Sequence, residues 1–311
     1  MKGDLSRLKN CFTALLSPMD EDEDLCKQTY REFIRLQIKA GCGLVPCGTT
    51  GESATMSHQE HESVIRWCLE EAAASGKKPF VLAGAGSNST KEALSLALHA
   101  ERMEVDGILV ITPYYNKPTQ KGLIAHYSEL AKAVDIPIVI YNCPGRTGGN
   151  ILPDTVAELA NKYENIRGYK AAEGKIEQIS QVIQKCPKDF VVMSGDDGLT
   201  YDIMKAGGKG VISVASNVIP ERMQKYCELM TAGNWEEAKN EDNALQDLFK
   251  VLFVETNPSP AKYAAELLGL LSRRVRLPLV PPEPESQEKI KEVLVKMGLT
   301  LNPYKGNSNK C

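Results

Sequence analysis

The sequence predicts a (β/α)8 barrel followed by a C-terminal helical region. Eight short apolar runs recur at similar intervals, and the segments between them have apolar residues at helical spacing. The runs are continuously apolar and rich in Val and Ile, which indicates strands buried on both faces and therefore a parallel sheet. An open doubly wound sheet is the alternative. Eight near-equal units in 311 residues favour closure, and the turn at 84–89 lacks the third glycine of a dinucleotide fingerprint.

The expected strands and helices alternate eight times, and the alternation ends near residue 232. We expect strands at residues 11–16, 43–46, 79–84, 107–111, 137–142, 166–170, 190–194 and 210–213. We expect the helices between them at residues 30–40, 58–74, 90–104, 123–134, 154–162, 176–185 and 199–206. Each helix expectation depends on apolar residues three and four positions apart, which form one buried face.

Beyond residue 232 the pattern becomes helical only. Helices are expected at 235–255, 260–271 and 287–296, with a proline-rich link at 278–284. The last eleven residues are polar and aperiodic. Three parts are therefore expected: a catalytic barrel at 1–232, a helical region at 233–298 and a flexible tail at 299–311.

The composition favours a small soluble ligand over a nucleic acid or a membrane. The chain has 37 Lys and Arg against 40 Asp and Glu, a net charge of -3, without long blocks of one sign. Nine cysteines without paired spacing predict reduced thiols and a cytoplasmic location. The N-terminus has no apolar signal region, and no stretch approaches the roughly 18 apolar residues of a spanning helix, so we expect neither secretion nor insertion.

Lys170 is the candidate nucleophile because it ends the sixth apolar run, and barrels build their active sites at the C-terminal ends of the strands. An exposed lysine, with a pKa of about 10.4, is almost wholly ammonium at neutral pH. Burial in the barrel mouth would lower that pKa and allow a Schiff base with a carbonyl substrate. A lysine that packs its stem on a strand and extends its ammonium to solvent is the alternative.

Three other strand ends carry residues that suit the same chemistry. The turn at 48–53 is rich in Gly, Thr and Ser, whose N–H groups and hydroxyls can hold a carboxylate, although such a segment is also an ordinary turn. Tyr114 and Tyr115 follow the fourth run, where packing is the usual role of tyrosine. Tyr141 and Arg146 lie at and after the end of the fifth apolar run. A guanidinium can bind a carboxylate through two parallel hydrogen bonds, or it can form a surface ion pair. Together with the lysine, they suit Schiff-base carbon–carbon chemistry on a keto acid.

Metal and cofactor chemistry are not expected. His58 and His61 have a spacing that can bind zinc, but neither a third ligand nor an HExxH pattern accompanies them. Cys143 lies beside the fifth-strand tyrosine, where a small buried hydrophobe is favoured over a reactive thiol.

These motifs together resemble the dihydrodipicolinate synthase family, within the wider N-acetylneuraminate lyase superfamily, over about residues 5–298. The matching segments are GTTGES at 48–53, YYNKPT at 114–119, YNCPGRTG at 141–148, Lys170, SGDD at 194–197, GVIS at 210–213 and ETNPSPAK at 255–262. Arg146 in its frame is typical of the synthases rather than of the sugar-acid lyases. Two residues depart from the family pattern: Tyr169 replaces the usual aliphatic residue, and Ala171 stands where glutamate is common.

The resemblance implies a cofactor-free lyase in the diaminopimelate branch of lysine synthesis. Lys170 would condense with pyruvate, and the enamine would attack L-aspartate 4-semialdehyde. Tyr141 would transfer protons at the Schiff base, linked through Thr49 to Tyr115 as a hydroxyl relay. Another pyruvate-dependent aldolase with a different aldehyde is the first alternative, and a non-catalytic barrel that only binds a small acid is the second.

The resemblance also implies substrate contacts and an assembly. Thr50 would bind the pyruvate carboxylate and Arg146 the carboxylate of the aldehyde, while Gly195 and Ile212 would line the site through backbone groups. The expected assembly is a homodimer or a homotetramer, a dimer of dimers. Tyr115 would then cross the tight dimer interface.

Feedback inhibition by L-lysine is the last expectation from the resemblance. Lysine-sensitive members of the family bind the effector in a cleft at the tight dimer interface. The matching residues here are Ser53, Ala54, His58, His61, Asn88, Glu92 and Tyr114. Each of them alone is an ordinary polar or small surface residue, so only their joint occurrence supports the site.

Overall fold

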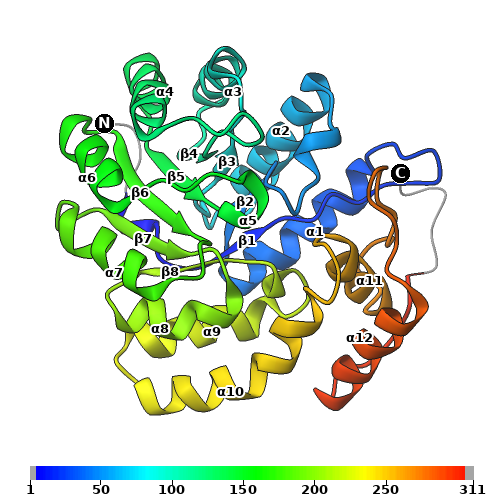
Figure 1. Cartoon of the computed structure of the whole chain (residues 1–311). Helices are drawn as coiled ribbons and strands as arrows, with labels where there is room; N and C mark the ends of the chain where they lie inside the picture. Colours follow the sequence, from blue (N-terminus) through cyan, green and yellow to red (C-terminus); the bar gives the residue numbers. More distant parts are fainter. Residues whose placement is uncertain (1–4, 305–311) are drawn as a thin grey trace. The chain divides into compact units, whose positions relative to one another are not determined.

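The computed structural model of the chain describes residues 5–304, and its strands and helices alternate as expected (Figure 1). The strands are β1 (Asn10–Ala14), β2 (Gly43–Val45), β3 (Leu82–Gly84), β4 (Gly107–Ile111), β5 (Ile138–Asn142), β6 (Ile166–Ala171), β7 (Val191–Ser194) and β8 (Gly210–Ser213). The fold is a (β/α)8 barrel with a C-terminal helical region, which confirms the predicted fold class.

Seven helices of the barrel agree with the expected segments to within a few residues at each end, and α5 and α9 are additional to those segments. The barrel helices are α1 (Lys27–Ala40), α2 (His58–Ala74), α3 (Thr90–Arg102), α4 (Gln120–Ala133), α5 (Pro144–Thr147), α6 (Pro153–Lys162), α7 (Ile176–Lys185), α8 (Thr200–Lys205) and α9 (Pro220–Thr231). The C-terminal helices are α10 (Trp235–Val251), α11 (Ser259–Leu267) and α12 (Pro284–Lys296). Among the described residues, no helix has the length and apolar character needed to cross a membrane.

Residues 5–10 and 80–212 form one compact unit, in which β3 to β8 lie side by side in chain order and run parallel. Consecutive helices of this unit touch, α3 against α4, α4 against α6 and α6 against α7, and cover the strands (Figure 1). Their starts are set by local side chains, since the hydroxyls of Ser89 and Thr119 accept from backbone N–H groups in the first turns of α3 and α4.

The register within this unit decides which side chains meet at the strand ends. Tyr141 on β5 lies opposite Lys170 on β6, and Lys170 lies opposite Met193 on β7. Because successive strand residues point to opposite faces, Tyr141 and Lys170 share one face of the sheet, while Asn142 and Tyr169 share the other.

Residues 11–79 and 213–304 form the second described unit, with β1 parallel to β2 and with α1, α2 and α9–α12. Helix α2 begins with a capping box, in which Ser57 and Glu60 each bond to the backbone N–H group of the other. Helix α1 ends at Gly41, whose φ of 87° suits glycine.

The largest differences from the expected elements lie in this second unit. Helix α9 ends at Thr231, where the eight-fold alternation was expected to end, although no bounds were predicted for it; Met223, Tyr226 and Met230 give it a buried face at helical spacing. Helix α10 ends at Val251, four residues before the expected end, and α12 starts at Pro284, a residue favoured in the first helical turn.

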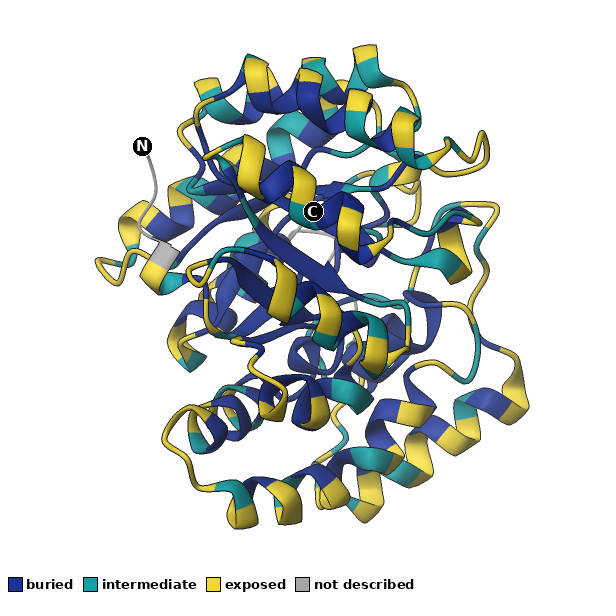
Figure 2. Ribbon diagram, turned by 60° about the vertical axis from the view of Figure 1, so that its left-hand side comes forward, coloured by how far each residue is buried: buried dark blue, intermediate teal, exposed yellow. Residues whose placement is uncertain are grey.

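The strands are buried along most of their length, whereas most helices have an exposed side, coloured yellow in Figure 2. At the end of the described chain, the backbone N–H groups of Asn302 and Tyr304 donate to carbonyl oxygens of Leu267 and Glu266. Residues 305–311 of the expected flexible tail lie outside the described residues, and the expected boundary at residue 232 stays a prediction.

Candidate active site

Lys170 lies near the C-terminal end of β6 with only 7% of its surface exposed. Its Nζ is 4.2 Å from the centroid of the Tyr141 ring, on the neighbouring strand β5. The strand register brings these two residues together, because they lie directly opposite each other on the same face of the sheet. The predicted nucleophile and the predicted proton carrier are therefore in contact.

Burial lowers the pKa of Lys170 to about 8. Cys143 and Asp197 oppose this shift by favouring the ammonium, and the positive charge of Arg146 adds to it. A lysine with this pKa is about one tenth neutral at pH 7, whereas an unperturbed lysine is neutral in less than one part in a thousand. The environment therefore supplies the unprotonated amine that attack on a carbonyl requires.

The segment after β5 forms a short helix, α5, which carries the predicted arginine. Pro144 occupies the first position of α5, and the helix ends at Gly148, which has a φ of 69°. Arg146 is exposed, and Cys143 is a half-buried free thiol. The guanidinium is thus on an accessible turn beside the end of β5, and its charge reaches Lys170.

Gly195 directly follows β7, and its backbone N–H donates to the carbonyl oxygen of Ala171 over 2.7 Å. A Cβ at this position would lie 3.0 Å from Lys170 Cε and equally close to Ala171 O, so a larger residue would press on the lysine. Ile212, the other predicted backbone contact, is buried on β8. Asp197 is a nearby acid to which sequence reasoning assigned no role, and only its electrostatic effect on the lysine identifies it.

Tyr114 and Tyr115 lie in the loop after β4, and their surroundings differ. Tyr115 is 88% exposed and has a φ of 71°, a backbone conformation that non-glycine residues rarely adopt. Its N–H donates to the carbonyl oxygen of Thr147 at the end of α5, which ties the two loops together. Asn116 in the same loop donates to the carbonyl oxygen of Asn88 over 2.8 Å.

In the second unit, the C-terminal helical region holds the turn at 48–53. Thr50 is buried, and its Oγ1 accepts a 3.0 Å hydrogen bond from Asn257 Nδ2. Glu52 has a φ of 58°, and its buried carboxylate forms an ion pair with Lys262, which is also buried. The second carboxylate oxygen accepts from the backbone N–H of Arg276 over 3.0 Å. These contacts come from residues more than 200 positions away in the sequence.

The two histidines of helix α2 differ in their exposure. His58 is exposed and His61 is buried. Within residues 5–304, no group of three or more His, Cys, Asp and Glu side chains is arranged to hold a metal ion.

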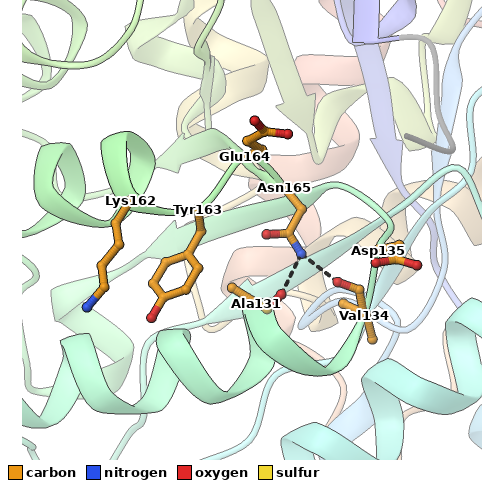
Figure 3. A pocket seen from close by; sticks show the side chains of 7 residues that line it. All are labelled: Ala131, Val134, Asp135, Lys162, Tyr163, Glu164 and Asn165. Carbon is orange, nitrogen blue, oxygen red and sulfur yellow. Dashed lines mark hydrogen bonds between the residues drawn. The ribbon is translucent and has the colours of Figure 1, made fainter.

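Figure 3 shows a pocket that contains none of the predicted site residues. It lies at the C-terminal ends of α4 and α6, next to the start of β6, whereas Lys170 is at the other end of that strand. The Asn165 amide donates to the carbonyl oxygens of Ala131 and Val134 and so caps α4. The Asn165 side chain in this lining therefore has a structural role at the end of α4.

Comparison with known proteins gives one consistent result. The family model of the dihydrodipicolinate synthetase family matches residues 7–297. A relative from Maridesulfovibrio salexigens is named 4-hydroxy-tetrahydrodipicolinate synthase and is 46% identical over 292 residues, which cover 94% of this chain and 99% of the relative. The crystal structure of dihydrodipicolinate synthase from Aquifex aeolicus superposes with a TM-score of 0.92 at 41% identity, covering 94% and 99% of the two chains.

Two further solved structures contain small molecules. The Acinetobacter baumannii enzyme, in complex with pyruvate, has a TM-score of 0.90 at 36% identity, and the Cyanidioschyzon merolae enzyme, with lysine bound, has a TM-score of 0.91 at 37% identity. Each covers 94% of this chain, and this chain covers 99% of each. The family match and the relatives span nearly the whole sequence, and the chain therefore belongs to the dihydrodipicolinate synthetase family.

Proposed function

We propose that Lys170 is the nucleophile of a 4-hydroxy-tetrahydrodipicolinate synthase reaction, which condenses pyruvate with L-aspartate 4-semialdehyde. The observation that carries this proposal is the buried amine at the end of β6, with its pKa lowered to about 8 and the Tyr141 ring against it. The shared name of the curated relatives supports the same activity, a lyase reaction of lysine biosynthesis.

The neutral amine of Lys170 adds to the keto carbon of pyruvate, and loss of water forms the Schiff base. Removal of a proton from the pyruvate methyl group gives an enamine, and its carbon attacks the aldehyde carbon of the second substrate. The amino group of that substrate then attacks the Schiff-base carbon, closes the ring and releases the lysine. No step transfers electrons to an external acceptor, so the residues need only to move protons and hold charge.

Tyr141 is the proposed proton carrier for these steps, because its ring lies over Nζ of the lysine. Thr49 and Tyr115 complete the proposed hydroxyl relay. The relay needs a second copy of the chain if Tyr115 serves a neighbouring site, and its 88% exposure and strained backbone support that role. We propose a homodimer or a homotetramer on this ground.

The two substrate carboxylates require different partners. Thr50 is proposed to bind the pyruvate carboxylate: its oxygen accepts from Asn257, so its single hydroxyl proton is available for donation. Arg146, exposed on α5, is proposed to bind the carboxylate of the aldehyde substrate. Gly195 and Ile212 are proposed to line the site through their backbone.

Borohydride trapping with pyruvate tests the nucleophile. The imine is reducible, so peptide mapping should find the adduct on Lys170. Lys175 is the matched control, because it is an exposed lysine five residues further along the same segment. Lys170→Ala should abolish trapping and turnover in a coupled assay with both substrates, whereas Lys175→Ala should leave both unchanged. An adduct elsewhere on an active enzyme would exclude this mechanism.

A panel of aldehydes tests the second substrate. Turnover with L-aspartate 4-semialdehyde should exceed that with sugar aldehydes, and Arg146→Ala should remove most of it while the pyruvate adduct still forms. Preference for another aldehyde would favour a different aldolase of the superfamily. An adduct with no turnover on any aldehyde would favour a protein that only binds keto acids.

We also propose that L-lysine inhibits the enzyme, as the lysine-bound Cyanidioschyzon merolae relative suggests. The candidate residues in the first unit are Asn88, Glu92 and Tyr114, and the Glu92 carboxylate accepts from the buried Ser87 hydroxyl. Glu92 is proposed to pair with the effector's α-ammonium. The candidates in the second unit are Ser53, Ala54, His58 and His61.

Inhibition kinetics test this site. Millimolar L-lysine should inhibit in a way that added pyruvate does not overcome, and Glu92→Ala should remove the inhibition while retaining catalysis. Activity that does not change with L-lysine, together with no heat of binding, would contradict the proposal.

A further inference from the structure

Tyr169 immediately precedes the candidate nucleophile and is completely buried. Strand alternation places its ring on the opposite face of the sheet from the Lys170 side chain. A buried phenol needs a hydrogen-bond partner, and an aliphatic residue at this position would need none. The Tyr169 hydroxyl therefore needs partners on the side of the sheet that faces away from the Lys170 side chain.

The hydroxyl of Tyr169 connects the two strands that carry the candidate catalytic residues. It donates to Glu173 Oε1 over 2.8 Å, and its oxygen accepts from Asn142 Nδ2 over 2.8 Å. Asn142 directly follows Tyr141 on β5, just as Tyr169 directly precedes Lys170 on β6. One cross-strand pair, Asn142 with Tyr169, therefore lies behind another, Tyr141 with Lys170.

Both polar atoms of the Asn142 side chain form hydrogen bonds. Its second amide hydrogen is donated to Asn150 Oδ1 over 2.8 Å, and its Oδ1 accepts from the Ile151 N–H over 3.3 Å. Asn150 exchanges hydrogen bonds with Gln178 on α7, at 2.9 and 3.0 Å. The network thus joins β5, β6, α7 and the segment before α6, and its hydrogen bonds favour one arrangement of these elements.

The charges of the network favour the observed hydrogen-bond directions. Burial and the nearby Glu173 carboxylate raise the pKa of Tyr169 well above its ordinary value, so the phenol keeps its proton and donates. Burial raises the pKa of Glu173 to about 6, so at neutral pH the carboxylate accepts. A hydrogen bond to a charged acceptor in such surroundings is stronger than one between neutral groups.

We propose that Tyr169 and Glu173 are positioning residues, which hold β5 and β6 at the spacing that keeps the Lys170 amine against Tyr141. This inference rests on the proposed function of the lysine. Loss of the link should let the two strand ends shift relative to each other. A displacement of the order of 1 Å in a reacting pair costs up to about a hundredfold in rate.

Tyr169→Phe is the central test, because it removes the hydroxyl and keeps the ring. Tyr127→Phe is the matched control: Tyr127 is equally buried, on α4, and its hydroxyl donates to the carbonyl oxygen of Val110 on β4 over 3.0 Å. Both variants should lose a similar amount of thermal stability. Only Tyr169→Phe should lose about tenfold in kcat, with KM for pyruvate changed by less than about twofold.

Two variants of Glu173 provide the conservative rescue. Glu173→Gln keeps an oxygen that accepts from Tyr169 and should retain at least about half of the wild-type kcat. Glu173→Ala removes the acceptor and should behave like Tyr169→Phe. If both variants lose the same kcat, or if Tyr169→Phe matches Tyr127→Phe, the positioning role is wrong.

Borohydride trapping on the same proteins separates this inference from the proposed function. Wild type that traps pyruvate on Lys170, with Tyr169→Phe trapping it more slowly at the same residue, supports both. Wild type that traps on Lys170, with Tyr169→Phe trapping at the rate of Tyr127→Phe, overturns the positioning role alone. Wild type without an adduct on Lys170 overturns the proposed function, and the positioning role with it.

Discussion

Two lysines are buried among residues 5–304, Lys170 and Lys262, and their surroundings differ in one respect. Lys170 on β6 forms no ion pair among the described residues, and burial lowers its pKa to about 8. Lys262 on α11 is completely buried, but its ammonium pairs with Glu52 and also donates to the carbonyl oxygen of Arg274. Desolvation lowers the pKa of Lys262 as well, and the Glu52 carboxylate opposes that shift.

The difference shows that burial alone does not make a nucleophile. A paired and hydrogen-bonded ammonium in the interior is a structural group, because separation from its partner would leave two uncompensated charges. An unpaired buried amine instead becomes neutral more readily, which leaves its lone pair available. Lys170 at the end of β6 is therefore the candidate nucleophile, whereas Lys262 is a structural group of the C-terminal region.

The largest expected effect is the loss of catalysis in Lys170→Met. Turnover should fall by about a thousandfold or more because the Schiff base cannot form. The free energy of unfolding should hardly change or should rise, since an unpaired buried amine is replaced by an apolar side chain of similar length. Steady-state kinetics and urea unfolding measure the two effects. A large loss of stability would show that Lys170 is also structural.

Lys262→Met should give the opposite result. Removing one partner of a buried ion pair leaves the Glu52 carboxylate uncompensated, and we expect a loss of about 3–5 kcal/mol in the free energy of unfolding. Lys239→Met is the control, because Lys239 is about half exposed and pairs with Asp242 at 2.9 Å, and it should cost less than about 1 kcal/mol. If Lys262→Met and Lys239→Met lost the same free energy of unfolding, Lys262 would not have the structural role that distinguishes it from Lys170.

The pH dependence of imine formation sharpens the comparison. Only the neutral amine reacts, so the initial rate with pyruvate should rise about tenfold per pH unit below 8 and level off above it, because burial lowers the pKa of Lys170 to about 8. Cyanoborohydride trapping over a pH series measures this rate. A rate that keeps rising to pH 10 would mean that the pKa of Lys170 is not lowered.

The smallest expected effect concerns Glu60, which supports the same C-terminal region as Lys262. Its hydrogen bond with Arg276 lowers the pKa of Glu60 to about 2. Because this pKa is lower in the folded than in the unfolded chain, the stabilisation is complete above about pH 4.5 and is lost as the pH falls toward 2. Glu60→Gln keeps the capping geometry and should cost roughly 1–2 kcal/mol at pH 7.

The control for Glu60→Gln is a series of stability measurements at decreasing pH. The stabilities of wild type and Glu60→Gln should approach each other as the pH falls from 4.5 to 2, because the unfolded chain gains its proton at Glu60 over that range and the folded carboxyl is about half protonated at its pKa of about 2. Denaturant unfolding at several pH values measures the difference. If the difference in the free energy of unfolding stayed constant across this pH range, the Glu60 charge would not be the cause of the stabilisation.

Sequence patterns were sufficient where the cause is local. The apolar run at Gly107–Ile111 became β4 with the expected bounds, and the capping box at Ser57 set the start of α2. The alternation predicted a last barrel helix that ends near residue 232, and α9 ends at Thr231. The turn around Arg146 was not identified as a helix because four residues are too few to show a period. Motif order also indicated the family, since the matching segments occur at strand ends throughout the chain.

The sequence by itself determined the alternation of strands and helices, the strand-end position of Lys170 and the family, because these depend on periodicity and on short motifs. The tertiary structure alone decided that Lys262 forms an ion pair while Lys170 forms none within residues 5–304, since Glu52 lies 210 positions before Lys262 in the chain. It also decided that Tyr169 reaches Asn142 and Glu173. The pKa of a side chain and its hydrogen bonds depend on which groups lie close to it in space. The order of residues in the sequence does not give these distances.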